Sequence, residues 1–113
     1  MPSITPNVSF DHVAREWRCK WSSDHDSASL SACQDALTSL ALPALKAAYP
    51  NAEVTRTVCG GCHDFKVAVR LPAAEFGKFE ADGFGPEGAF LDKLKFIEGV
   101  SMVETQTFTL EKL

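Results

Sequence analysis

Residues 52–71 read AEVTRTVCGGCHDFKVAVRL, and this stretch decides the fold. Its first seven and last seven residues alternate apolar with polar side chains, which is the period of strands that bury one face. Gly60 and Gly61 lie between these runs and can take the positive φ angles that a tight type I′ turn requires. The stretch therefore predicts a β-hairpin that carries Cys59 and Cys62 on its two shoulders.

One strand and one helix are expected before this hairpin. In residues 13–21, Arg15 and the two tryptophans lie on one side and most of the charged side chains on the other, so the tryptophans should face the core. Residues 30–48 repeat apolar side chains along one helical face, and Pro43 should kink or break that helix. The Asp-Ser pair at residues 26–27 is expected to supply its N-terminal cap.

The chain after the hairpin predicts a further helix and a last strand. Residues 72–85 contain a short helical candidate followed by a glycine-rich loop. Pro86 suits the first turn of the next helix, which should end near Gly99. Residues 100–110 alternate again as a threonine-rich strand. The predicted order is therefore strand, helix, strand, strand, helix, strand.

This order resembles the ferredoxin-like βαββαβ sandwich, an α+β fold in which a four-stranded antiparallel sheet carries two helices on one face. The resemblance is one of pattern and covers about residues 13–110. It divides the chain into an extended N-terminal arm, residues 1–12, and a single ferredoxin-like domain, residues 13–113. Because proteins of this fold include enzymes, metal carriers and regulatory modules, the fold leaves the function open.

Composition argues against two classes of partner. The 113 residues include 11 Lys and Arg against 15 Asp and Glu, a net charge of −4, so no nucleic acid partner is expected. The longest apolar-rich stretch, residues 37–48, is too short and too polar to span a bilayer, so no membrane partner is expected. The N-terminus lacks a signal-peptide pattern, and four cysteines are few for a disulfide scaffold. A cytoplasmic or other reducing soluble compartment is therefore expected.

The predicted topology gathers the candidate site residues at one end of the sandwich. The turn of the hairpin should lie at the same end as the loop that precedes the first helix, which brings Cys59, Cys62 and His63 toward His25. The last strand begins at this end too, so Met102 is also expected there.

Four interpretations of this end compete. Cys59, Cys62, His63 and His25 form a soft-donor set suited to zinc or, with fewer ligands, to copper(I). The two cysteines alone have the spacing of a thiol–disulfide redox pair, and a nearby helix N-terminus would favour the reactive thiolate. The run Cys-Gly-Gly-Cys-His also matches the attachment pattern of c-type haem, with Met102 as a second axial ligand. In the fourth interpretation the glycines make the turn and the cysteines are inert.

A different class of function uses the open face of the sheet, which charged and threonine side chains should line. Many ferredoxin-like proteins pair two such faces into a dimeric α+β barrel, and in this alternative a homodimer binds or converts a small molecule. Cys19 and Cys33 are expected to act as small buried apolar residues. We favour a soft-metal or redox module at Cys59 and Cys62, and the sequence leaves open whether the protein is an enzyme.

Overall fold

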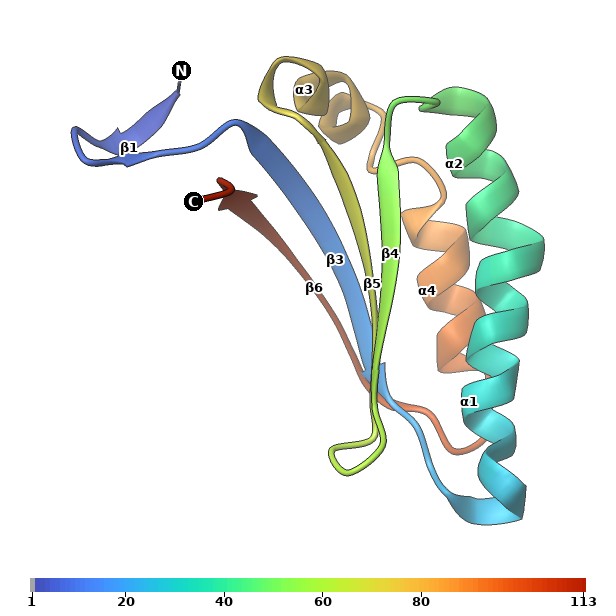
Figure 1. Cartoon of the computed structure of the whole chain (residues 1–113). Coiled ribbons are helices and arrows are strands. Elements are labelled where there is room, and N and C mark those ends of the chain that lie inside the picture. Colours follow the sequence, from blue (N-terminus) through green and yellow to red (C-terminus); the bar gives the residue numbers. More distant parts are fainter. Residues whose placement is uncertain (1) are drawn as a thin grey trace.

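A computed structural model describes residues 2–113 as an antiparallel sheet with helices on one face (Figure 1). The strand order is β4-β5-β3-β6, with β3 (His12–Lys20), β4 (Glu53–Cys59), β5 (Asp64–Pro72) and β6 (Ser101–Leu110). The helical layer consists of α1 (Asp24–Ala36), the π-helical turn η1 (Leu37–Ala41), α2 (Leu42–Ala48) and α4 (Glu87–Lys95). The predicted α+β class and the four-stranded antiparallel sheet are therefore confirmed.

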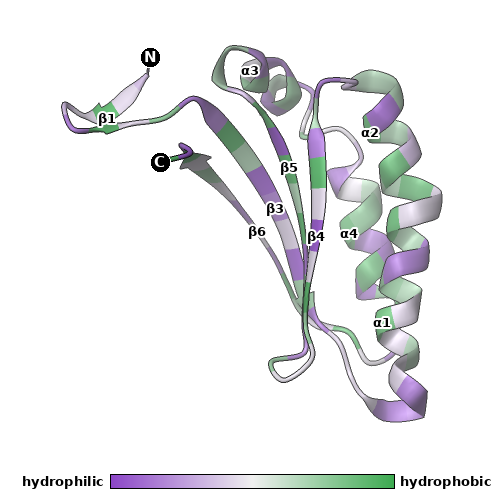
Figure 2. Ribbon diagram, in the orientation of Figure 1, coloured by the Kyte–Doolittle hydropathy of each residue, from purple (hydrophilic) through white to green (hydrophobic). Residues whose placement is uncertain are grey.

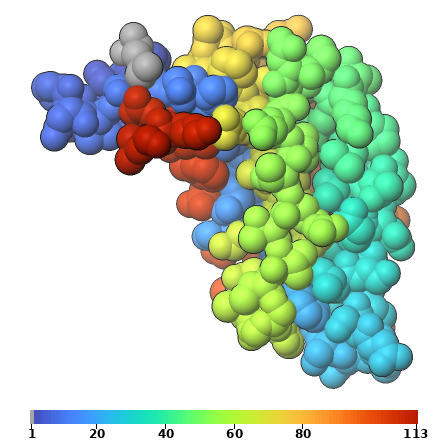
Figure 3. Space-filling model, viewed as in Figure 1, coloured from blue at the N-terminus to red at the C-terminus, as the bar shows by residue number. Residues whose placement is uncertain are grey.

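Two additions make the predicted pattern incomplete. The short helical candidate within residues 72–85 is confirmed as a helix, α3 (Ala73–Ala81), which follows β5 directly and which the predicted element order left out. The described part of the expected arm is not merely extended, because β1 (Ser3–Thr5) pairs with β2 (Val8–Ser9) in a small second sheet. This hairpin projects from the body of the protein (Figure 3). The main sheet begins at His12, one residue earlier than expected.

Alternation along the two central strands builds the core. Trp17 on β3 and Phe65, Val67 and Val69 on β5 are fully buried and face the helical layer. Bands of hydrophobic and hydrophilic residues alternate along the strands in Figure 2. The hydrophobic effect therefore fixes the register, because a slip of one residue would turn this apolar row away from the helices.

The long helical run continues through Pro43 instead of breaking there. The amide of Leu42 donates to the carbonyl of Leu37, five residues earlier, so the turn before the proline is widened into a π-turn. This widening relieves the crowding that the proline ring imposes on the preceding turn, where proline also lacks a donor. None of the helices within residues 2–113 is long and apolar enough to cross a membrane.

The start of α1 differs from the prediction of a side-chain cap by residues 26–27. His25, Asp26 and Ser27 all have positive φ angles, of 54°, 56° and 60°, and form a left-handed turn. The structure shows no side-chain cap hydrogen bond at this end of α1; instead the amide of Ser27 donates to the carbonyl of Ser23. Consecutive left-handed residues that are not glycine are strained, so the loop after β3 must hold them in place.

Tyr49 is the only tyrosine of the chain and gives the fold a spectroscopic test. Its ring lies edge-on against Phe79, and its hydroxyl donates to Asp82. Burial and then the Asp82 carboxylate raise the pKa of Tyr49 to about 12, because both favour the neutral phenol. A raised pKa in the folded state means that stability falls as pH rises above about 10, the value for an unfolded chain.

We expect an ultraviolet absorbance titration of the folded protein to show phenol ionisation near pH 12. The denatured chain should ionise near pH 10. Asp82→Ala should lower the folded midpoint and leave it above the denatured value, since burial remains. A folded protein that ionises at the same pH as the denatured chain would show that Tyr49 is not packed in this way.

Candidate functional site

The loop between β4 and β5 has four residues, not the two that a type I′ turn requires. Cys59 pairs with Asp64, so Gly60 to His63 form the loop, and Cys62 lies within it instead of on the opposite shoulder. The positive φ falls on His63, at 59°, and on neither glycine. The predicted hairpin is therefore confirmed, whereas its predicted turn type is wrong.

The loop brings the two cysteines into direct contact. The amide of Cys62 donates to Cys59 Sγ across 3.1 Å. Cys59 is half-buried at the end of β4, and Cys62 is exposed. A hydrogen bond from the Cys62 thiol, together with its amide, lowers the pKa of Cys59, and the same shared proton raises the pKa of Cys62. The arrangement favours a thiolate at Cys59 with a protonated thiol beside it.

Lys20 belongs to this site, although no sequence motif connects it with the two cysteines. Its ammonium group donates to the carbonyl of Cys62 across 3.0 Å and pairs with the Asp64 carboxylate. The bond to Asp64 raises the pKa of Lys20, so the group stays cationic beside the thiols. The pairing of β3 with β5 would have identified Lys20, because it places Lys20 and Asp64 directly opposite each other on neighbouring strands.

His63 faces an indole ring and not the sulfur atoms. Its imidazole stacks on Trp21, with ring centroids 4.5 Å apart and an angle of 17° between the ring planes. The carbonyl of His63 accepts from the Trp21 amide, and the Trp21 indole donates to the carbonyl of Asp64. The hairpin loop therefore lies against the end of β3. This confirms that the hairpin loop and the loop between β3 and α1 lie at the same end of the sandwich.

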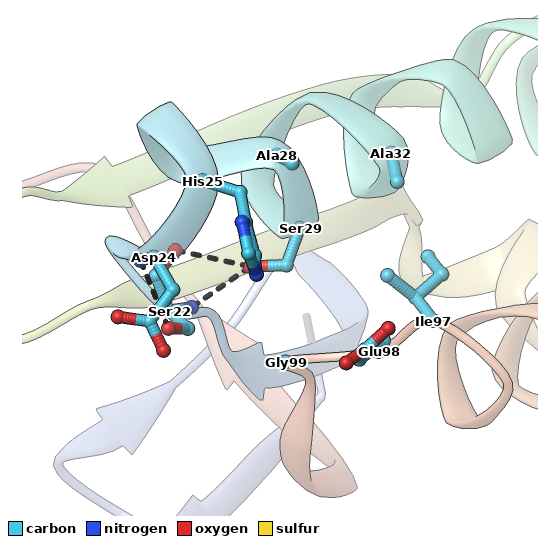
Figure 4. A pocket seen from close by; sticks show the side chains of 9 residues that line it. All are labelled: Ser22, Asp24, His25, Ala28, Ser29, Ala32, Ile97, Glu98 and Gly99. Atoms are coloured by element: carbon cyan, nitrogen blue, oxygen red, sulfur yellow. Dashed lines mark hydrogen bonds between the residues drawn. The ribbon is translucent and has the colours of Figure 1, made fainter.

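His25 lies at that end but in another cavity, of about 270 Å³. Figure 4 shows its imidazole turned toward Ser29, beside the loop that holds Gly99. Neither cysteine of the hairpin lines this cavity. Over the described residues, 2–113, no three His, Cys, Asp or Glu side chains gather so that they could hold a metal ion. The predicted set of two cysteines and two histidines is thus not assembled, and binding of zinc or copper(I) stays a prediction.

Met102 lies near the hairpin end, as its position at the start of β6 suggested. It is exposed, has a φ of 53° and lines a small cavity of about 210 Å³ with Lys20 and Asp64. A c-type haem would need the His63 imidazole to face iron, whereas that ring is stacked on Trp21. Attachment of haem stays a prediction.

The open face of the sheet is charged, as expected, and its charges compensate one another within the chain. Arg18 lies 3.5 Å from both Glu16 and Glu104, and Arg70 lies 3.6 Å from Glu53. Each of these cations has an acidic neighbour, but within residues 2–113 Nε of Arg18 and Nε of Arg70 are buried without a hydrogen-bond partner. A homodimer through this face, with a small molecule bound or converted between its layers, stays a prediction.

Comparison with known proteins extends to the fold alone. No family model matches this sequence, and no curated protein is significantly similar to it. A de novo designed protein with a ferredoxin fold, solved by solution NMR, superposes with a TM-score of 0.51 at 12% identity, over 90% of this chain and 87% of the other. An uncharacterised protein from Thermotoga maritima superposes with a TM-score of 0.41 at 11% identity, over 89% of this chain and 98% of that one. The likeness to the designed protein supports the ferredoxin-like fold and carries no information about activity.

Proposed function

We propose that Cys59 and Cys62 are a thiol–disulfide redox pair that exchanges two electrons with a disulfide-containing or dithiol partner. The observation that carries this proposal is the 3.1 Å contact between the Cys62 amide and Cys59 Sγ, which holds the loop residue Cys62 against Cys59 at the end of β4. A dithiol needs its two cysteines close together, and this backbone contact keeps Cys62 beside the Cys59 sulfur.

The chemistry assigns a different role to each cysteine. The Cys59 thiolate attacks one sulfur of a partner disulfide, forms a mixed disulfide and expels the other sulfur as a thiolate. The Cys62 thiol then loses its proton and attacks Cys59 Sγ, which expels the second partner thiolate and leaves an intramolecular disulfide. Two electrons have passed from the pair to the partner, and the reverse sequence oxidises a dithiol.

The surroundings of the loop favour this exchange. The Lys20 ammonium lies beside the loop and stabilises a thiolate there. The Asp64 carboxylate holds Lys20 in place, although its own negative charge disfavours the thiolate. Cys62 is exposed, and the loop projects from the end of the sheet (Figure 1), so a partner chain can approach it. The two sulfur ligands alone suit a redox pair better than a four-coordinate zinc site.

The test is thiol exchange with oxidised glutathione, followed by alkylation and mass spectrometry. We expect the wild-type chain to become about 2 Da lighter through a bond between Cys59 and Cys62. Cys62→Ser should retain one bound glutathione on Cys59, because nothing resolves the mixed disulfide. Cys59→Ser should react much more slowly, because the thiol and amide donors that lower the pKa act on Cys59 and not on the remaining Cys62.

Two results would contradict the redox proposal. The first is a wild-type chain that keeps both hairpin thiols in oxidised glutathione while an unstructured control peptide of residues 57–66 oxidises. The second is equal reaction rates for Cys59→Ser and Cys62→Ser. Native mass spectrometry with added Zn²⁺ or Cu⁺ is the matching control. Metal bound by the wild type and lost from the Cys59→Ser, Cys62→Ser double variant would assign the loop to soft-metal binding instead.

A further inference from the structure

A second pair of cysteines lies inside the core, away from the hairpin loop. Cys19 on β3 and Cys33 on α1 are 2% and 0% exposed, and their Sγ atoms are 3.8 Å apart. The prediction that both are buried is confirmed. Their contact was not expected, because they were assigned separately to a strand and to a helix face.

The position of this pair makes a covalent link feasible. A disulfide bond requires the sulfur atoms at about 2.05 Å, so they must approach by somewhat less than 2 Å. Rotation about the Cα–Cβ bonds moves a sulfur atom by that order, and the core around the pair consists of the side chains of Trp17, Phe65 and their neighbours. The two cysteines are separated by 14 positions in sequence, so the bond would close a short loop that contains the left-handed turn at the start of α1.

We propose that Cys19 and Cys33 form an internal disulfide bond when the protein meets hydrogen peroxide, and that this bond ties the second half of α1 to β3. One thiolate attacks the peroxide, the O–O bond breaks, and a sulfenic acid and one water form after proton uptake. The second sulfur then displaces the hydroxyl group, the S–O bond breaks and a second water leaves. Two thiols and one hydrogen peroxide thus give one disulfide and two waters.

The geometry also assigns the order of events. Both sulfur atoms are shielded from solvent between β3 and α1, so peroxide reaches them only when α1 separates locally from the sheet. The hairpin cysteines need no such opening, since Cys62 is exposed. A hydrogen bond from Cys33 lowers the pKa of Cys19, which makes Cys19 the attacking sulfur once the site is open. Oxidation of the internal pair should therefore be slower than that of the hairpin pair, by a factor on the order of ten or more.

The experiment uses the Cys59→Ser, Cys62→Ser double variant, in which Cys19 and Cys33 are the only thiols left. After incubation with hydrogen peroxide, we expect the chain to become about 2 Da lighter and to resist alkylation in denaturant. Digestion should release one peptide pair linked through these two positions. The oxidised form should unfold at a temperature higher by roughly 10 °C, and a reductant should reverse the shift.

Cys33→Ala in the same background is the matched control. It removes one of the two thiols, and alanine is well suited to a helix such as α1. It should lose the 2 Da shift and yield sulfinic acid or a linked dimer at Cys19 instead. The proposal is overturned if the parent variant takes up oxygen on separate cysteines. It is also overturned if both thiols can still be alkylated after a peroxide treatment many times longer than the hairpin pair of the wild type needs for full oxidation. Because the linked peptide is read in the parent variant, the test stands even where the alanine variant fails to fold.

Discussion

Trp17→Ala should lower the free energy of unfolding by about 4 kcal/mol. Trp17 is fully buried at the centre of the sheet, and its indole lies 5.5 Å from the ring of Phe90 on α4. The substitution removes this apolar contact between the sheet and the helix and leaves a cavity that the surrounding side chains fill only in part. Urea denaturation followed by circular dichroism measures the change through the transition midpoint.

Trp17→Phe is the control that separates volume from polarity. Within residues 2–113, Nε1 of Trp17 is buried without a hydrogen-bond partner, which is unfavourable in the folded state. Phenylalanine removes this unpaired donor while it loses part of the indole volume, so the two effects oppose each other. We expect a net loss of about 1 kcal/mol. Equal losses for the two variants would contradict the packing described here.

The strand pattern was sufficient to predict the sheet, because alternation reports directly which side chains are buried. The runs on both sides of the hairpin loop became β4 and β5, and the alternate apolar residues of β5 are buried as predicted, whereas on the edge strand β4 Val54 is only half-buried and Val58 is exposed. The turn between them was less predictable. Gly60 and Gly61 permit positive φ without requiring it, and the chain placed the left-handed residue at His63 instead. Glycine content alone therefore does not determine loop length.

The candidate site could be predicted in part, because topology brings chain ends together but does not orient their side chains. The hairpin loop and the end of β3 meet as expected, yet His63 stacks on Trp21 and His25 turns toward Ser29. Lys20 required the strand register, which emerges only when the sheet is assembled. The contact between the two buried cysteines likewise depends on how α1 lies across β3.

One charged residue, Arg15, interrupts the apolar face of β3, so the alternation of apolar and polar residues does not describe this part of the core. Arg15 shares with Trp17 the face of β3 that points toward the helices. A charged side chain is unfavourable there unless it is paired. The structure supplies the partner: both carboxylate oxygens of Glu87 accept from Arg15, at 2.8 and 2.9 Å. Thr105 and Thr107 accept two further hydrogen bonds, and the guanidinium lies 4.0 Å above the Phe84 ring.

Glu87→Ala should therefore lower the free energy of unfolding by about 3 kcal/mol. The two side chains of the pair are only 16% and 13% exposed, so the substitution leaves the Arg15 cation largely buried without its acidic partner. A surface ion pair would contribute about 1 kcal/mol or less. The same denaturation experiment distinguishes these cases, and a loss below about 1 kcal/mol would show that water reaches the guanidinium.

The double variant Arg15→Met, Glu87→Leu tests whether the loss comes from an unpaired charge or from the missing bridge. If the unpaired cation is responsible, removing both charges should restore much of the stability that Glu87→Ala loses, since apolar side chains of similar volume fit the same space. Together with the single variants Arg15→Met and Glu87→Leu, the double variant closes a cycle whose coupling energy should then be about 2 kcal/mol. If the bridge itself anchors α4 to β3, the double variant should be as unstable as the single one. We expect the first result, because Phe84 and the stems of both side chains already make this site apolar.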